Sequence, residues 1–336
     1  MYEFSTVFEV EIGEGNCSAG IQVSATAPGI VETETAKSTF HEFALQRGAM
    51  SVAIEVNNEL QAKLNKLNNE LRSLGSLLVA YSGGVDSAFL AWAAHQVIPG
   101  KMLAVISDSP SLARAQLLDA IAFCKEYGIP CHRISTGEMQ RPEYVRNDGM
   151  RCFHCKDELF TALESFRKER HFESIVYGVN TDDQGDYRPG QQAALAHGVK
   201  APLLEAGLSK QDIRNLAHAA GLRVWNKPAS ACLASRVEYG REVSLEVLRQ
   251  IETAEDALRD LGFRQFRVRH HGKIARIEIA REELPRAMSL EMADELVRIF
   301  KSVGFTYVTL DLEGFRSGSM NAILPIASLV DAAGKR

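Results

Sequence analysis

Three cysteines stand out first, because their type and spacing could support metal or sulfur chemistry. Cys152 and Cys155 lie in the stretch MRCFHCK, and Cys232 follows 77 positions after Cys155 in SACLASR. A closed zinc site takes four ligands, and a disulfide framework takes an even number of cysteines. The residues alone leave three interpretations open: a disulfide between the paired cysteines, buried core thiols, or a zinc site completed by His132, His154 or His270.

A second stretch, SGGVDS, has the composition of a phosphate-binding loop. Its glycines let the backbone approach an anion closely, and the helix expected after it offers unpaired N–H groups and a partial positive charge. Asp86 is acidic, so beside a polyphosphate it needs a cation between, and Mg²⁺ is the natural one. The core of a Walker A loop, Gly-Lys-Ser/Thr, is missing. The predicted nucleotide site consists of Ser82, Gly83, Gly84, Val85, Asp86 and Ser87.

Three later stretches carry further candidate residues: GVNTDDQGDYRPG, KPASACLASR and FRVRHHGKIARIEI. In the last, Arg267 and Arg269 stand two apart on one face of an expected strand. Guanidinium groups bind phosphates and carboxylates through forked hydrogen bonds, although these two arginines could instead form a solvated face. The further candidates for the nucleotide and the substrate are Gly178, Arg188, Arg236 and Glu255.

The elements that must position these residues alternate between strands and helices. Leucines at helical spacing predict a first helix after Met50. Short apolar runs predict buried strands at 77–81, 102–107, 131–135 and 173–180. Helices are expected at about 111–127 and at 208–221, the latter with Ser209 as its N-cap. This alternation predicts an α/β fold with a doubly wound parallel sheet.

Beyond about residue 240 the pattern changes to a small α+β unit. A helix at about 244–261 precedes two alternating strands that are separated by Gly-Lys, which is a hairpin signal. A helix at about 290–303 and a strand over TYVTLDL follow. We therefore predict a poorly ordered or upstream-start extension at 1–49, an α/β domain at 50–240, an α+β substrate or oligomerisation domain at 241–325, and a tail at 326–336.

Composition narrows the function classes. The formal net charge of −5 and the sequence pI of about 6.0 argue against a protein that holds long nucleic acid by its phosphates. Six cysteines among 336 residues are too sparse for a disulfide scaffold, so we expect the reducing cytoplasm. No apolar run is long enough to predict a membrane span. Cys124 and Cys131 are expected to be core thiols.

The SGGVDS loop resembles that of the PP-loop ATP pyrophosphatases, which cleave ATP between the α- and β-phosphates and adenylate their substrates. Together with the RPG, CLASR and RVRHH stretches, the resemblance narrows to the LarE family. Members of this family are ATP-dependent sulfur transferases of nickel-pincer nucleotide synthesis. The resemblance runs from about residue 55 to about residue 320.

The resemblance implies a function for each group of residues. The substrate would be pyridinium-3,5-biscarboxylic acid mononucleotide, and ATP with Mg²⁺ would activate each ring carboxylate before sulfur displaces AMP. Cys152, Cys155 and Cys232 would hold a 4Fe–4S cluster with an open iron that carries the donated sulfide. In single-cysteine members the thiol matching Cys232 is itself consumed, which is the alternative here. The family also implies a homo-oligomer.

Three other functions remain as alternatives. A tRNA thiolase of the same superfamily also combines a PP-loop with three cysteines, but the acidic pI does not favour it. An amidating synthetase leaves the cysteines unexplained. A non-catalytic nucleotide-binding regulator would release no pyrophosphate.

Overall fold

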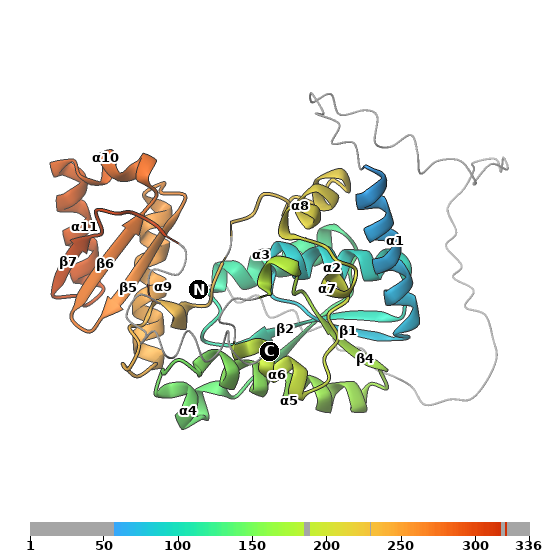
Figure 1. Cartoon of the computed structure of the whole chain (residues 1–336). Coiled ribbons are helices and arrows are strands. Elements are labelled where there is room, and N and C mark those ends of the chain that lie inside the picture. Colours follow the sequence, from blue (N-terminus) through green and yellow to red (C-terminus); the bar gives the residue numbers. More distant parts are fainter. Residues whose placement is uncertain (1–56, 185–188, 229, 317–319, 321–336) are drawn as a thin grey trace, which may run out of the picture. The chain divides into compact units, whose positions relative to one another are not determined.

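The computed structural model describes residues 57–184, 189–228, 230–316 and Met320 (Figure 1). All of them belong to one compact unit, Ala53–Arg336. The extension predicted at 1–49, the tail at 326–336 and the candidate Arg188 lie outside the described residues. The domain boundaries drawn from the sequence therefore stay predictions.

The larger sheet has four parallel strands in the order β3-β2-β1-β4. The strands are β1 (Leu77–Ala80), β2 (Met102–Asp108), β3 (Cys131–Ser135) and β4 (Ser174–Tyr177). All four lie within one or a few residues of the predicted strands. Because β1 is buried at every position, its run of apolar residues fits a central strand of a parallel sheet.

Helices cover both faces of this sheet, which confirms the doubly wound α/β fold (Figure 1). The core on one face includes residues from α1 (Asn58–Ser73), α2 (Val85–Val97), α3 (Arg114–Glu126) and α8 (Lys210–Ala219). The core on the other face includes residues from α5 (Arg151–Glu169) and α6 (Pro189–Ala196). Ser209 caps α8 and forms a capping box with Asp212, as its position predicted.

The smaller sheet has the order β5-β6-β7. Its strands β5 (Phe266–His271) and β6 (Ile274–Ile279) are antiparallel, and β7 (Tyr307–Leu310) runs parallel to β6. Helices α9 (Leu245–Asp260) and α11 (Leu290–Ser302) pack on one face of the sheet and share its apolar core. The predicted hairpin and the separate C-terminal sheet are thus confirmed.

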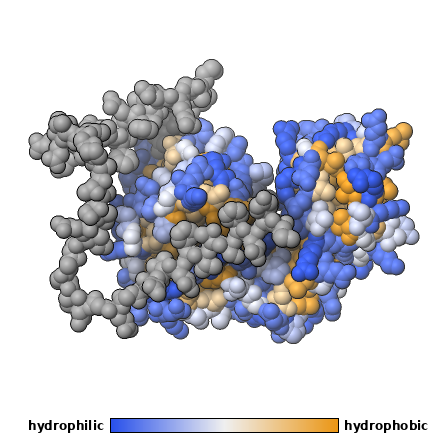
Figure 2. Space-filling view, turned by 180° about the vertical axis from the view of Figure 1, so that it is seen from behind, coloured by the Kyte–Doolittle hydropathy of each residue, from blue (hydrophilic) through white to orange (hydrophobic). Residues whose placement is uncertain are grey.

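Shorter elements connect these layers. They are α4 (Pro142–Val145), α7 (Pro202–Glu205), α10 (Leu284–Ala287), and the 3₁₀ turns η1 (Glu138–Gln140), η2 (Thr181–Asp183), η3 (Leu233–Arg236) and η4 (Arg281–Glu283). On the face seen in Figure 2, hydrophilic residues predominate between scattered apolar ones. Within the described ranges, every helix is too short or too polar to cross a membrane.

Candidate functional site

The SGGVDS loop leaves the carboxyl end of β1 and begins α2. Gly83 has φ of 72°, a left-handed conformation that favours glycine, and Gly84 is the N-cap of α2 without a side chain. The backbone N–H of Ser82 donates to Ser87 Oγ at 3.1 Å, and the two serine hydroxyls are 3.0 Å apart. The loop is therefore held by its own hydroxyls, with the first amides of α2 available to an anion.

Two neighbouring segments press on this loop so closely that they exclude side chains. A Cβ on Gly83 would lie 2.7 Å from Ala120 Cβ in α3. A Cβ on Gly178, just after β4, would lie 2.7 Å from the backbone N of Ser87. Gly178 was a nucleotide-binding candidate, and the structure places it against the first turn of α2, where it supports the loop by close packing.

Asp86 faces a lysine that sequence reasoning missed. Its Oδ2 lies 2.6 Å from Lys210 Nζ, at the start of α8. Burial raises the pKa of the Asp86 carboxyl, while Lys210 opposes that rise. Asp86 Oδ1 is buried without a hydrogen-bond partner. An orphaned carboxylate oxygen at the start of a phosphate loop is a suitable ligand for Mg²⁺.

A second lysine also contacts the loop. Lys227 Nζ donates to the Gly83 carbonyl oxygen at 2.9 Å and pairs with Asp119 at 2.6 Å. Neither lysine was a candidate, although Lys227 begins the stretch KPASACLASR, because each reaches the loop from a distant segment. The structure thus adds two cations to the predicted phosphate site.

The carboxyl ends of the strands enclose a cavity of about 120 Å³ that contains two of the three candidate cysteines. Cys155, from α5, and Cys232 line it together with Ser82 of the phosphate loop. Ligands of open α/β sheets bind in this position. Burial raises the pKa of the Cys155 thiol, and the proximity of Cys232 adds to the rise.

Cys152 is placed differently from its partner. It lies one turn before Cys155 on α5 and is exposed, although residues three apart share a helix face. Among the residues that the structure describes, no three of the His, Cys, Asp and Glu side chains stand close enough to hold a metal ion. Of the histidines weighed for a zinc site, His132 stacks on Phe166 and His270 bonds Gln250.

Polar groups that sequence reasoning missed complete the wall of the cysteine cavity. Glu138 is 2% exposed and accepts a hydrogen bond from Ser109. The hydroxyl of Ser111 forms a hydrogen bond with the Tyr144 hydroxyl. The carbonyl oxygen of Ser111 accepts from the backbone N–H of Leu233 at 2.8 Å. This last bond ties the loop after β2 to the residue next to Cys232.

The loop that carries Cys232 is anchored by a buried ion pair. Arg236 meets Glu255 through two parallel hydrogen bonds of 3.0 and 3.1 Å, and the side chains are 3% and 7% exposed. Arg236 also donates to the Cys232 carbonyl oxygen at 2.7 Å. Both residues were candidates for contact with ligands, and the structure places them as supports of the cysteine loop.

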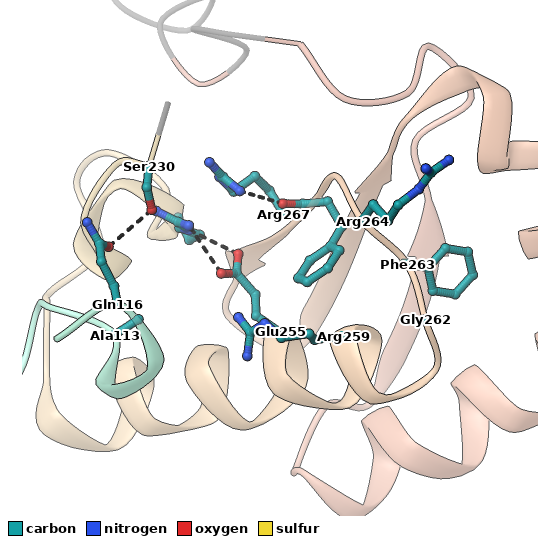
Figure 3. Close-up of a pocket in the computed structure, with 11 residues that line it drawn as sticks. Ala113, Gln116, Ser230, Glu255, Arg259, Gly262, Phe263, Arg264 and Arg267 are labelled. Atoms are coloured by element: carbon teal, nitrogen blue, oxygen red, sulfur yellow. Dashed lines mark hydrogen bonds and ion pairs between the residues drawn. The ribbon is translucent and has the colours of Figure 1, made fainter. Parts of the chain in front are cut away.

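A basic pocket of about 470 Å³ lies on the other side of this loop (Figure 3). Its cationic lining comes from Arg236, Arg259, Arg264 and Arg267, while Glu255 is its acid. Burial and then the neighbouring Arg236 lower the pKa of Arg267 to about 10. An anion would relieve the repulsion between these guanidinium groups.

Arg269 does not line this pocket. Its side chain is 8% exposed and pairs with the fully buried Glu278 at 2.8 Å, and it donates to the Ser235 carbonyl oxygen at 3.2 Å. The alternative that Arg267 and Arg269 form a solvated face is therefore wrong for Arg269. The two arginines of one strand face have different surroundings, because Arg269 bonds Ser235 in the 3₁₀ turn η3 and Glu278, whereas Arg267 lines the basic pocket.

One side chain connects the phosphate loop to the basic pocket. Gln116, in α3, donates to the Ser82 carbonyl oxygen at 3.3 Å and accepts from Ser230 Oγ at 3.1 Å. Ser230 lines the basic pocket and Cys232, two residues on, lines the cysteine cavity. The three parts of the site therefore share the segments 111–116 and 230–232 as walls.

Comparison with known proteins finds relatives along most of the chain. The profile of the NAD synthase family matches residues 56–147. The chain is 33% identical to the pyridinium-3,5-bisthiocarboxylic acid mononucleotide synthase of Lactiplantibacillus plantarum over 275 residues, which cover 82% of this chain and 99% of that protein. It is 41% identical to an uncharacterized protein of Synechocystis sp., over 79% of this chain and 99% of the relative. An uncharacterized protein of Methanocaldococcus jannaschii is 30% identical, over 76% of this chain and 98% of the relative.

Proposed function

The chain belongs to the LarE family of PP-loop proteins, and from this premise we propose that it is an ATP-dependent sulfur transferase. Its substrate would be pyridinium-3,5-biscarboxylic acid mononucleotide, and its product the corresponding bisthiocarboxylic acid. The support is the match to the synthase of L. plantarum along nearly its whole length. We further expect a cytoplasmic homo-oligomer.

In the first step, the phosphate loop would hold ATP through the amides that begin α2 and through Ser82 and Ser87. A ring carboxylate oxygen of the substrate attacks the α-phosphorus, and pyrophosphate leaves with the electron pair of the broken P–O bond. Asp86 would hold Mg²⁺ through the oxygen that lacks a partner. Lys210 and Lys227 lie where they could neutralise phosphate charge.

The basic pocket would bind the anionic groups of the substrate. Two carboxylates and a phosphate carry several negative charges, and the guanidinium groups there suit planar oxyanions. Arg267 is the central candidate, because it lines the pocket beside Arg236, and burial and then that neighbouring charge lower its pKa. The walls shared with the phosphate loop would bring a bound carboxylate toward ATP.

In the second step, a sulfur nucleophile attacks the carbonyl carbon of the acyl adenylate, and AMP leaves as the C–O bond breaks. Cys152, Cys155 and Cys232 would hold a 4Fe–4S cluster, which when bound supplies an exchangeable sulfide. Two of the thiols line one cavity and the third lies one helical turn away, although among the described residues no three such side chains stand within reach of one metal ion. The chain itself would orient Cys232 through Arg236 and exclude water with the surrounding apolar residues.

The observation that carries this proposal is the shared cavity of Ser82, Cys155 and Cys232. It brings the phosphate loop and two thiols to one edge of the sheet, as sulfur transfer to an adenylate requires. The exposure of Cys152 favours the sacrificial alternative as a second candidate. In this alternative, the Cys232 sulfur attacks the acyl adenylate and displaces AMP. The Cβ–Sγ bond of Cys232 then breaks with loss of the Cα proton, so the sulfur leaves with the product as a thiocarboxylate and dehydroalanine remains.

The test is anaerobic turnover with ATP, Mg²⁺, substrate and an external sulfide source, followed by mass spectrometry of protein and product. With a cluster, Cys152→Ala, Cys155→Ala and Cys232→Ala each abolish bound iron and multiple turnover. With sacrificial transfer, Cys152→Ala stays active and the wild-type protein loses about 34 Da, the mass of H₂S expected from Cys chemistry. If the wild-type protein releases no pyrophosphate with the substrate present, the proposed function is wrong.

A further inference from the structure

The two remaining described cysteines lie outside the candidate site but directly behind the phosphate loop. Cys124 is in the last turns of α3 and is 2% exposed. Cys131 begins the edge strand β3, is half-buried, and packs against the same apolar cluster as Cys124. Neither residue takes part in the proposed function.

A tight turn brings together the two segments that carry these thiols. Helix α3 ends at Glu126, and Gly128 reverses the chain with φ of 65°. The backbone N–H of Ile129 returns to the Cys124 carbonyl oxygen at 2.8 Å, so β3 starts beside the helix that precedes it. The thiol of Cys124 interacts with the sulfur of Cys131, which raises the pKa of Cys124 and lowers the pKa of Cys131.

Cys131 is the more exposed of the two thiols. Cys131 lines a surface pocket of about 490 Å³ whose charged and polar lining includes Asp108, His132, Arg133 and Ser135. Reactive cysteines are partly exposed and lie near positive charge, whereas buried structural cysteines are inert. Cys131 fits the description of a reactive thiol, and the buried Cys124 is the neighbouring thiol that would resolve its sulfenic acid.

The same helix turn forms the back wall of the phosphate loop. Tyr81, the residue before SGGVDS, donates from its hydroxyl to the Ala120 carbonyl oxygen at 3.1 Å. Burial and the adjacent Cys124 raise the pKa of this phenol. Ala120 also limits the space at Gly83. A change in the last turns of α3 therefore acts on residues that hold the loop.

We propose that Cys124 and Cys131 are a peroxide-oxidised thiol pair whose intramolecular disulfide lowers ATP affinity at the phosphate loop. The Cys131 thiolate attacks a hydroperoxide, the O–O bond breaks, and a sulfenic acid and an alcohol or water result. The Cys124 thiol then attacks that sulfur, and water leaves as the S–S bond forms. A dithiol reductant reverses the reaction by two thiol–disulfide exchanges.

The disulfide can be mapped directly in the full-length protein. Trypsin cuts after Arg114, Lys125 and Arg133, so the two cysteines fall on separate peptides, 115–125 and 126–133. After treatment with hydrogen peroxide and alkylation, these peptides are expected to be joined and to separate on reduction with dithiothreitol. The Cys131→Ser variant should show no joined pair. Absence of the joined pair in oxidised wild-type protein would overturn the proposal.

The effect on the loop is measured in the variant Cys152→Ser, Cys155→Ser, Cys232→Ser, which removes the thiols of the candidate site. We expect peroxide to change amide hydrogen exchange in residues 77–90 and to raise the Kd for ATP about fivefold or more, within the usual range of coupling between sites. Adding Cys131→Ser should remove both effects. A joined pair with unchanged exchange would refute the coupling.

This inference rests on the proposed function only through ATP binding. Failure of the reduced protein to bind ATP would count against the proposed function, while hydrogen exchange would still decide whether the thiol pair acts on the loop. The two proposals therefore fail in distinguishable ways.

Discussion

Glu255 and Arg236 form a two-pronged ion pair beneath the loop that carries Cys232. The Oε1 atom of Glu255 also accepts from the backbone N–H of Val268 at 3.1 Å, so the pair links α9, β5 and the cysteine loop. Removing one partner of a buried pair leaves an uncompensated charge, which is far more destabilising than the pair is stabilising.

We therefore expect Glu255→Gln to lower the free energy of unfolding by about 3 kcal/mol and to uncouple the two half-reactions. Pyrophosphate release should continue, while thiocarboxylate formed per pyrophosphate falls because Cys232 is no longer held. Chemical denaturation and product analysis measure the two effects. Glu246→Gln, an exposed acid on the same helix, is the control. Unchanged coupling in Glu255→Gln would contradict the positioning role.

Asp86→Asn should raise the Mg²⁺ concentration needed for ATP-dependent pyrophosphate release. The substitution keeps the shape of the side chain but removes the charge that would hold the cation. Titration of Mg²⁺ at fixed ATP gives the measurement. Asp182→Asn is the control, because Asp182 is exposed and accepts from the backbone N–H of Lys210. Equal Mg²⁺ dependence in the two variants would show that Asp86 does not bind the metal.

Arg267→Ala and Arg269→Ala should behave differently, although the two residues are neighbours on one strand face. Arg267 lines the basic pocket, so its loss should raise the KM for the nucleotide substrate about tenfold, corresponding to a lost charged hydrogen bond of ~1.5 kcal/mol. Arg269 is paired with Glu278, so its loss should mainly destabilise the fold. Steady-state kinetics and thermal unfolding separate the two. Selective loss of ATP affinity in Arg267→Ala would show that the substrate does not bind in the basic pocket.

The stability of the α5–α6 region should depend on pH through His197. Burial lowers the pKa of its imidazole, but hydrogen bonds to Asp157 at 3.0 Å and Glu164 at 2.9 Å outweigh burial and raise it above 6.5. A raised pKa contributes stability that is complete below pH 6.5 and disappears as pH rises through the folded value.

The difference in unfolding free energy between wild type and His197→Gln should therefore be larger at pH 5.5 than at pH 8.5, because the charged imidazole meets its two carboxylate partners only in the folded protein. Urea denaturation at the two pH values measures it. His171→Gln is a control, because His171 lies at the exposed end of α5. A difference that grows toward high pH would show that the imidazole is neutral in the folded protein.

Much of the fold could be predicted because local patterns and the tertiary structure agree. The apolar run at 77–81 and the glycines after it predict a buried strand followed by a phosphate loop, and β1 and α2 form there. The Gly-Lys step between β5 and β6 likewise predicts their hairpin. In each case the chemical signal lies within a few adjacent residues.

The candidate site was predictable only in part, since its contacts join segments far apart in the sequence. Lys210 and Glu138 lie outside the quoted motifs, and Lys227 begins KPASACLASR without having been a candidate; all three reach the site because the sheet brings strand ends together. Arg236 and Glu255 were predicted to contact the nucleotide or the substrate, but only the structure shows that they form an ion pair with each other. The helix α5, which carries Cys152 and Cys155, was not predicted. The CxxC spacing at its start was interpreted as a pattern of ligands.

The contact between Gly178 and Ser87 limits mutational tolerance at a position directly behind the phosphate loop. Since even one methyl group at residue 178 would overlap the backbone of α2, a saturation library at this codon should yield well-folded protein for glycine alone. Chain length between the two segments would be less restricted, because insertions in surface loops cost little when their ends stay fixed. The loop that begins α2 therefore requires the absence of a side chain at residue 178 as well as the sequence at 82–87.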